Sequence, residues 1–266
     1  MELIFLGTGS AMVTRCYNTC FALGNGEEFL LVDAGGGNGI LRQAELAKLE
    51  FSRMHDLFVT HAHTDHVLGV LWVVRVVSDL MNQERYTGDL NVWVHDQCKE
   101  LLEPLCRATF GPKQARNLGT RIHFRLMEDG TEFAAAGMKI TAFDIGSHKT
   151  KQFGFRAVLP GGKCLVCLGD EPCHAPCREM VRDCDWLLTE AFCCYEDRER
   201  FHPYEKFHST VLDAARIARE LNVRNLVLYH TEDKTLDTRK QRYTAEAASV
   251  YGGRIEVPDD LEILEI

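Results

Sequence analysis

The sequence predicts an α+β protein in which two β-sheets pack face to face and helices cover their outer faces. The first and second halves of the chain share a rhythm of several strands followed by helices. No linker, low-complexity tract or break in composition divides residues 1–266, so we expect a single layered domain. Hydrophobic residues make up 45% of the 266 residues and charged residues 26%, which is typical of a globular protein.

Apolar runs and turn residues define the expected elements of the first half. Strands are expected at residues 2–6, 18–24, 28–33, 54–60, 90–95, 121–127, 131–135 and 138–144, and helices at 38–49, 67–80 and 96–109. Gly24-Asn25-Gly26 is a strong hairpin signal. The glycines of loop 7–10 permit close approach to a phosphate, but the Gly-Lys-Ser/Thr of a nucleotide-binding loop is missing, so we expect a plain turn.

The second half continues with shorter elements. Strands are expected at residues 153–159, 163–168, 185–189, 225–229 and 261–265, and helices at 174–183, 210–221 and 239–250. The first two of these strands form a hairpin across Pro160-Gly161-Gly162. Residues 195–206 are polar and are expected to form a loop.

The segment Val59-Thr60-His61-Ala62-His63-Thr64-Asp65-His66 carries three histidines and one carboxylate between an apolar strand and a helix. Residues two apart in an extended segment point to the same side, so His61 and His63 can approach one ion together. Asp65 and His66 then face a neighbouring point. The spacing suits two adjacent metal ions. The simpler interpretation is a surface loop with Thr64 and Asp65 as helix caps, which leaves three histidines after a buried strand unexplained.

Other polar residues end expected strands, where packing alone gives no reason for them. They are His148, Asp170, Glu190 and His230. Together with the histidine segment they predict a cluster for two ions. One ion would be held by His61, His63 and His148, the other by Asp65, His66 and His230, with Asp170 bridging both.

Two further polar residues follow strands of the first half. Asp33 has two interpretations that the sequence does not separate: it orients a metal-bound histidine, or it caps the helix at 38–49. His95 is expected to be structural rather than a ligand.

Composition bears on partners and location. The net charge of −9 argues against a dedicated nucleic-acid binder, although a local basic patch would be compatible with it. The sequence contains no run of about 18 apolar residues, so we expect no membrane span. The N-terminal apolar run is too short for a signal peptide, and we therefore expect a cytoplasmic protein. The eleven cysteines are then expected to be reduced thiols; a separate structural zinc site is the alternative, but their spacings do not form the usual paired motif.

The motif His-Ala-His-Thr-Asp-His, followed by a lone His148, Leu-Gly-Asp170 and Leu-Tyr-His230, resembles the metallo-β-lactamase superfamily over nearly the whole chain. This resemblance implies a four-layer αβ/βα sandwich with the metal site at one edge between the sheets. The segments Phe5–Ser10, Thr189–Phe192 and Phe207–Thr210 resemble the ribonuclease Z branch more closely. There, Glu190 would orient His208, and His208 would contact the scissile phosphate or protonate the leaving oxygen.

Two departures from that branch affect the expected substrate. Ribonuclease Z enzymes carry a long arm that grips transfer RNA between the counterparts of His148 and Asp170; here these residues lie 22 positions apart, with room only for a hairpin. Of the family's Pro-x-Lys-x-Arg-Asn loop, only Asn18 is kept.

The resemblance implies a two-metal-dependent hydrolase, in first place a phosphodiesterase acting on RNA 3′ ends or on a smaller phosphodiester. Asp65 would hold the attacking water and act as general base, and His208 would act as general acid. Histidine-rich ligands suit zinc best, while manganese and iron are also accepted by such sites. Hydrolysis of a lactone or thioester is the alternative, followed by a metal-binding module without turnover. Some members are dimers, so a homodimer is also possible here.

Overall fold

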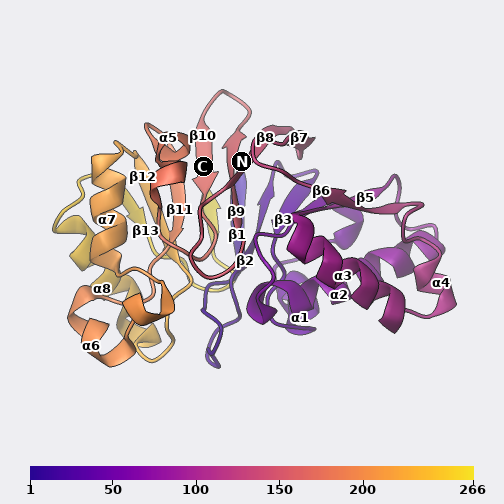
Figure 1. Cartoon of the computed structure of the whole chain (residues 1–266), viewed down its shortest axis with the longest axis horizontal. Helices are drawn as coiled ribbons and strands as arrows, with labels where there is room; N and C mark the ends of the chain where they lie inside the picture. Colours follow the sequence, from indigo (N-terminus) through magenta and orange to yellow (C-terminus); the bar gives the residue numbers. More distant parts are fainter.

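The fold is a sandwich of four layers, in which two sheets face each other and helices cover both outer faces (Figure 1). The computed structural model describes all residues from Met1 to Ile266. Each sheet has seven strands, in the orders β14-β1-β2-β3-β4-β5-β6 and β13-β12-β11-β10-β9-β8-β7. The predicted α+β sandwich is therefore confirmed.

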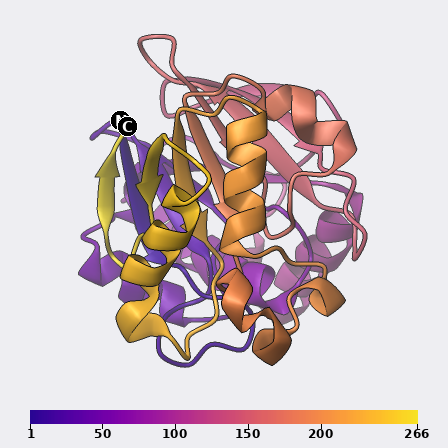
Figure 2. The ribbon, with the colours of Figure 1, turned by 90° about the vertical axis from the view of Figure 1, so that its left-hand side faces the viewer.

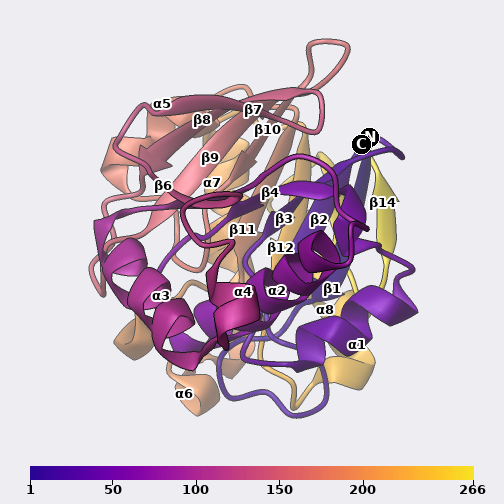
Figure 3. The ribbon, with the colours of Figure 1, turned by 90° about the vertical axis from the view of Figure 1, so that its right-hand side faces the viewer.

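The first sheet is built from the first half of the chain and the final strand. Its strands are β1 (Glu2–Gly7), β2 (Cys20–Gly24), β3 (Phe29–Val32), β4 (Met54–Phe58), β5 (Leu90–Val94), β6 (Ile122–Leu126) and β14 (Ile263–Glu265). β3 to β6 run parallel to one another, whereas β14, β1, β2 and β3 alternate in direction. The helices on its outer face are α1 (Gly39–Leu46), α2 (Thr64–Asn82), α3 (Asp96–Thr109) and α4 (Pro112–Ala115) (Figure 3).

The second sheet has the same mixed organisation. Its strands are β7 (Glu132–Ala135), β8 (Met138–Asp144), β9 (Phe153–Val158), β10 (Cys164–Cys167), β11 (Trp186–Glu190), β12 (Asn225–Tyr229) and β13 (Arg254–Glu256). β10 to β13 are parallel, and β7 to β10 are antiparallel. The helices on this side are α5 (Arg178–Val181), α6 (Arg198–Phe201), α7 (Val211–Glu220) and α8 (Leu236–Ala248), of which α7 and α8 cover the outer face (Figure 2).

Three apolar clusters separate the four layers. One joins the first sheet to α1, α2 and α3, the second lies between the sheets, and the third joins the second sheet to α7 and α8. The middle cluster explains why strands of both sheets are apolar on both faces, for example β3 and β10, whose residues are all buried. Both termini meet at one edge, where the Ile266 amide donates to the Met1 carbonyl (Figure 1).

Most predicted elements are present, with shifted ends, and several differ. The predicted helix at 174–183 is only two short turns, η2 (Ala175–Cys177) and α5. The predicted loop at 195–206 contains three short helical segments: η3 (Tyr195–Asp197), α6 (Arg198–Phe201) and η4 (Tyr204–Lys206). α4, β13 and the turn η1 (Phe51–Arg53) were not predicted, because three or four residues carry too little periodicity. No helix has the length and apolar character needed to cross a membrane.

Candidate metal centre

The candidate site lies at the edge where the parallel strands of both sheets end. Asp33 follows β3, the histidine segment follows β4, and α2 begins within that segment. In the second sheet, Asp170 follows β10 and His230 follows β12 directly. Because parallel strands end at the same edge, the topology brings polar residues far apart in sequence to one place.

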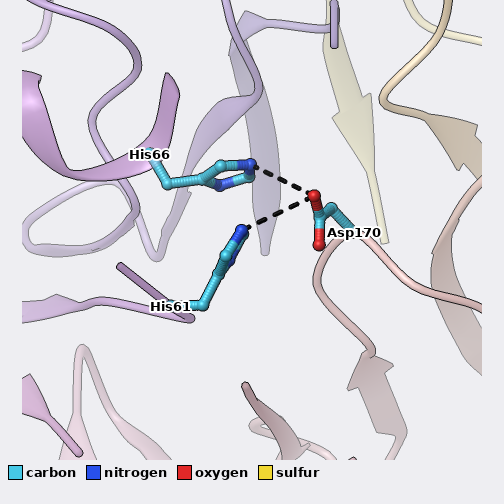
Figure 4. A group of neighbouring side chains, drawn as sticks. All are labelled: His61, His66 and Asp170. Carbon is cyan, nitrogen blue, oxygen red and sulfur yellow. Dashed lines mark ion pairs between the residues drawn. The ribbon is translucent and has the colours of Figure 1, made fainter. Parts of the chain in front are cut away.

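One carboxylate oxygen of Asp170 is the centre of the cluster. Its Oδ2 lies 3.5 Å from His61 Nε2, 3.5 Å from His230 Nε2 and 3.9 Å from His66 Nε2. Figure 4 shows the rings of His61 and His66 approaching this oxygen from the side of the first sheet. All four residues are buried.

The opposite ring nitrogen of each histidine is held by an oxygen. His66 Nδ1 lies 2.7 Å from Asp33 Oδ2, and His230 Nδ1 lies 3.1 Å from Thr19 Oγ1. Thr60 donates its hydroxyl to Asp33 Oδ2, so its oxygen accepts from His61 Nδ1, at 2.9 Å. The Nδ1 atoms therefore donate to these oxygens, and the Nε2 atoms face Asp170.

This arrangement settles the two interpretations of Asp33. The residue before α1 is Asn38, so Asp33 does not cap that helix. Its carboxylate instead accepts from the Thr60 amide, the Thr60 hydroxyl and the His66 ring. The backbone of Asp33 has φ 54° and that of His230 has φ 57°, an uncommon conformation that clusters at functional sites.

The donor set fits divalent metal ions. Three overlapping groups each hold their donor atoms within 4.8 Å of one another: His61–His66–Asp170, Asp65–His66–His230 and Asp170–His208–His230. His66 Nε2 is buried without a hydrogen-bond partner, as expected for an atom that binds a metal. Burial alone would raise the pKa values of Asp65 and Asp170, but the facing histidines hold both pKa values well below the usual range, so both carboxylates are ionised.

His63 and His148 differ in how they relate to this cluster. His63 Nδ1 lies 2.9 Å from His61 Nε2, so two neighbouring ring nitrogens converge on one point. His148 is exposed, and its ring stacks on His174 at 4.5 Å between centroids. The structure does not bring His148 to His61 and His63, so its role as a ligand stays a prediction.

Glu190 and His208 lie beside the cluster. Glu190 Oε1 accepts from the Ser209 amide at 2.6 Å, while Glu190 Oε2 lies 3.6 Å from His208 Nδ1. Neither of these last two atoms has a hydrogen-bond partner. Burial raises the pKa of Glu190 to about 8 and lowers the pKa of His208 to about 4, so both are neutral at pH 7.

Sequence reasoning missed four residues that shape this site. Thr19 and Thr60 hold two of the rings, Lys149 pairs with Asp170, and Glu171 is fully buried against the loop that carries His148. Thr60, Lys149 and Glu171 are each adjacent to a predicted ligand in sequence, which is a usable signal. Thr19 carries none, because its contact with His230 depends on the packing of the two sheets.

The loop at residues 7–10 is a turn, as predicted. The Thr8 and Gly9 amides both donate to the Tyr17 carbonyl, and the Ser10 amide donates to the Thr231 carbonyl. No amide of these three is left for a phosphate. All eleven cysteines are free thiols, and no group of residues positioned to hold a metal includes one.

The fold and the donor cluster define a metal-dependent hydrolase with the metallo-β-lactamase fold. Residues 1–249 match the family described as Anti-Pycsar protein Apyc1, so the chain belongs to that family. It is also similar to ribonuclease Z of Archaeoglobus fulgidus, with 26% identity over 100% of this chain and 97% of the relative. Ribonuclease Z of Bacillus subtilis is 24% identical over 99% of this chain and 98% of the relative.

Solved structures agree on the fold. The metallo-β-lactamase fold protein YhfI from Bacillus subtilis superposes with a TM-score of 0.78 at 17% identity, covering 99% of this chain and 98% of that one. The short form of human tRNase Z gives a TM-score of 0.76 at 19% identity, and the match covers 100% of this chain and 99% of that one. The predicted resemblance to the ribonuclease Z branch is therefore confirmed.

Proposed function

We propose that this protein is a two-metal phosphodiesterase whose substrate is a small phosphodiester. The observation that carries the proposal is the convergence of imidazole and carboxylate donors from both sheets on Asp170, with the Glu190–His208 pair beside it. A carboxylate with two oxygens suits the bridging position between two cations.

His61, His63 and His148 would hold one ion, and Asp65, His66 and His230 the other, with Asp170 shared. Zinc suits this imidazole-rich set best. Bound ions of this kind supply a water of lowered pKa and stabilise negative charge on a phosphoryl oxygen. Support for the assignment comes from the Nε2 atoms of His61, His66 and His230, which are directed at Asp170.

The chain's own residues would position the reactants and move the protons. The ionised Asp65, in the first turn of α2, accepts a hydrogen bond from the attacking water and takes its proton. His208 faces the cluster from the second sheet and would protonate the leaving oxygen. Glu190 holds a proton in this neutral pair, and its Oε2 lies 3.6 Å from His208 Nδ1. When an anionic substrate binds, Glu190 would pass this proton to Nδ1, and the resulting carboxylate would stabilise the imidazolium, which gives the proton on its other nitrogen to the leaving oxygen.

A small diester is favoured over RNA by what lies between His148 and Asp170. Only the hairpin β9–β10 fills this interval. The alignment with Archaeoglobus fulgidus ribonuclease Z spans 320 positions against the 266 residues of this chain, so the relative has residues that this chain lacks. With a net charge of −9, the chain also offers RNA little electrostatic attraction.

The test uses protein of known metal content and measures its turnover of three kinds of substrate. These are bis(p-nitrophenyl) phosphate, cyclic nucleoside monophosphates as small diesters, and a precursor transfer RNA with a 3′ trailer. Cleavage of small diesters alone supports the proposal. Cleavage of the RNA as well would show that this protein binds RNA without the inserted arm of ribonuclease Z enzymes. Hydrolysis of lactones or thioesters, with no diester cleaved, would overturn it.

His208→Ala tests the proton donor in the same assay. We expect it to retain both metals and to lose about a hundredfold or more in turnover, the usual effect of removing a general acid. His123→Ala, which removes a histidine on β6 paired with Asp89, is the matched control and should retain full activity. Undiminished turnover in His208→Ala would show that the leaving oxygen obtains its proton elsewhere.

Location and assembly belong to the same proposal. The free cysteines support a reducing compartment, and we propose the cytoplasm. A homodimer stays a prediction, which light scattering of the metal-loaded protein would check.

A further inference from the structure

Lys149 brings a positive charge into the candidate metal centre. Its Nζ lies 3.6 Å from Asp170 Oδ2 and 3.4 Å from His208 Nε2. The side chain is only 13% exposed. No other lysine or arginine forms an ion pair with Asp33, Asp65, Asp170 or Glu190.

A buried carboxylate fixes the backbone from which Lys149 extends. Glu171 follows Asp170 and is fully buried. It accepts hydrogen bonds from the Ser147 hydroxyl at 2.5 Å, from the His148 amide at 3.1 Å and from the Lys149 amide at 3.4 Å. His174 Nε2 lies 2.8 Å from Glu171 Oε2, the oxygen that also accepts from the His148 amide. The loop between β8 and β9 is thereby tied to the loop that carries Asp170.

The position of Lys149 is informative about its role. Burying an ammonium is costly unless it is paired, and a carboxylate shared by two cations no longer needs it. With resident ions on Asp170, the Lys149 ammonium requires another negative partner in the same place. That partner would lie between the predicted bridging carboxylate and the predicted proton donor, where a phosphoryl group reacts.

We propose that Lys149 binds a phosphoryl oxygen of the substrate, and that Glu171 is the positioning residue that holds Lys149 at the site. This inference rests on the proposed phosphodiesterase function. It also assigns the specificity of the site, because a fixed ammonium favours a diester, which carries one negative charge, over a neutral ester or lactone.

Three variants of the metal-loaded protein test the role of Lys149. Lys149→Met removes the charge and keeps the length of the stem, and Lys149→Arg restores the charge. Lys151→Met is the matched control, because Lys151 lies on the same loop but pairs with Asp96 outside the site. Metal content, calorimetric affinity for inorganic phosphate, and kcat and KM for bis(p-nitrophenyl) phosphate and p-nitrophenyl acetate are measured for each.

We expect Lys149→Met to keep its metals and to bind phosphate about ten- to a hundredfold more weakly, the range for one hydrogen bond to a charged group. KM for the diester rises by a larger factor than KM for the neutral acetate. Lys149→Arg recovers part of the phosphate affinity, and Lys151→Met matches the wild type. Unchanged phosphate affinity in Lys149→Met, or loss of metal from it, would overturn the proposal.

Glu171→Gln tests the positioning role. Gln has one acceptor oxygen in place of two, so it cannot hold the same loop contacts, and we expect weaker phosphate binding with metals retained. In the Lys149→Met background the same change should have little further effect, because both residues act through one contact. Additive losses would overturn the positioning role of Glu171.

These outcomes are separable from failure of the proposed function. If the wild type binds metal but cleaves no diester, the proposed function fails. If the wild type cleaves diesters and Lys149→Met binds phosphate as tightly, only the inference about Lys149 fails.

Discussion

Asp33 orients two histidines of the candidate site through its contacts with His66 and Thr60. Its carboxylate accepts from the Thr60 amide at 2.8 Å, and its other oxygen lies 2.7 Å from His66 Nδ1. The same oxygen accepts from Thr60, whose hydroxyl holds His61 Nδ1. One buried carboxylate thus fixes the orientation of two rings, those of His61 and His66, which belong to the same group of donors.

Asp33→Asn is expected to weaken metal binding by about ten- to a hundredfold, the usual cost of removing a partner of a metal-binding histidine. Asn tolerates positive φ, so the backbone at this position is kept. The measurement is competition for zinc with a chromophoric chelator. Asp89→Asn, a change of the same kind at an exposed residue, is the control. Equal zinc affinity in the two variants would contradict the role of Asp33.

A second carboxylate, Asp56 on β4, makes stability depend on pH. Burial raises the pKa of Asp56, and hydrogen bonds from Trp93 Nε1 and Asn91 Nδ2 offset this only in part. The folded protein therefore binds this proton more tightly than the unfolded chain. Stability from Asp56 is present at low pH and is lost as the pH rises through the folded pKa.

Asp56→Asn removes the buried charge and keeps an oxygen for Trp93. We expect this variant to have a higher unfolding temperature than the wild type at pH 7. The difference should disappear below pH 3.8, the ordinary pKa of an aspartate side chain. Circular dichroism melts from pH 3 to pH 8 measure it, with Asp89→Asn correcting for the change in net charge. A difference that does not vary with pH would contradict this account.

At the scale of elements, α2 is held against the loop after β3 by a glycine. The Gly69 amide donates to the Gly35 carbonyl at 2.9 Å, and the Ala34 amide donates to the His66 carbonyl at 3.1 Å. A Cβ at Gly69 would lie 1.8 Å from the Ala34 carbonyl oxygen. The first turn of α2 carries Asp65 and His66, so this close packing also positions two predicted ligands.

Gly69→Ala is expected to push α2 outward. Overpacking of this kind costs about 1–3 kcal/mol, and the displaced ligands should also lower metal affinity. Chemical denaturation measures the first effect and zinc competition the second. Gly37→Ala is the control, because a Cβ there meets nothing within 4 Å. If Gly69→Ala were as stable as Gly37→Ala, the packing would not require glycine.

The elements also show what the sequence could predict. β8, α3 and β12 begin and end where predicted, because apolar periodicity and turn residues define them. α2 begins three residues earlier than predicted, at Thr64, since its first turn consists of site residues rather than apolar ones. His148 shows the limit for the site. Motif position marks it as a ligand, but the direction of its ring depends on loop contacts that no local pattern encodes.

At the scale of the whole molecule, the candidate metal centre joins the two sheets. His61, His63, Asp65 and His66 belong to the first sheet and its helix, whereas Asp170 and His230 belong to the second. Away from this edge, the sheets are held mainly by the apolar cluster between them. Bound ions would therefore act as a bridge between the halves of the molecule.

Metal removal is accordingly expected to lower the stability of the whole fold. Ligands that bind only the folded state stabilise it by about 2.7 kcal/mol at a free concentration one hundred times Kd. For a chain of this size, that corresponds to roughly 5–10 °C in unfolding temperature. Calorimetry of zinc-loaded protein before and after dialysis against EDTA measures the shift. Asp170→Asn, which removes the charge of the predicted bridging carboxylate, should melt at nearly the same temperature with and without zinc. A wild type whose melting is insensitive to EDTA, although it has lost its zinc, would show that the sheets do not depend on the metal bridge.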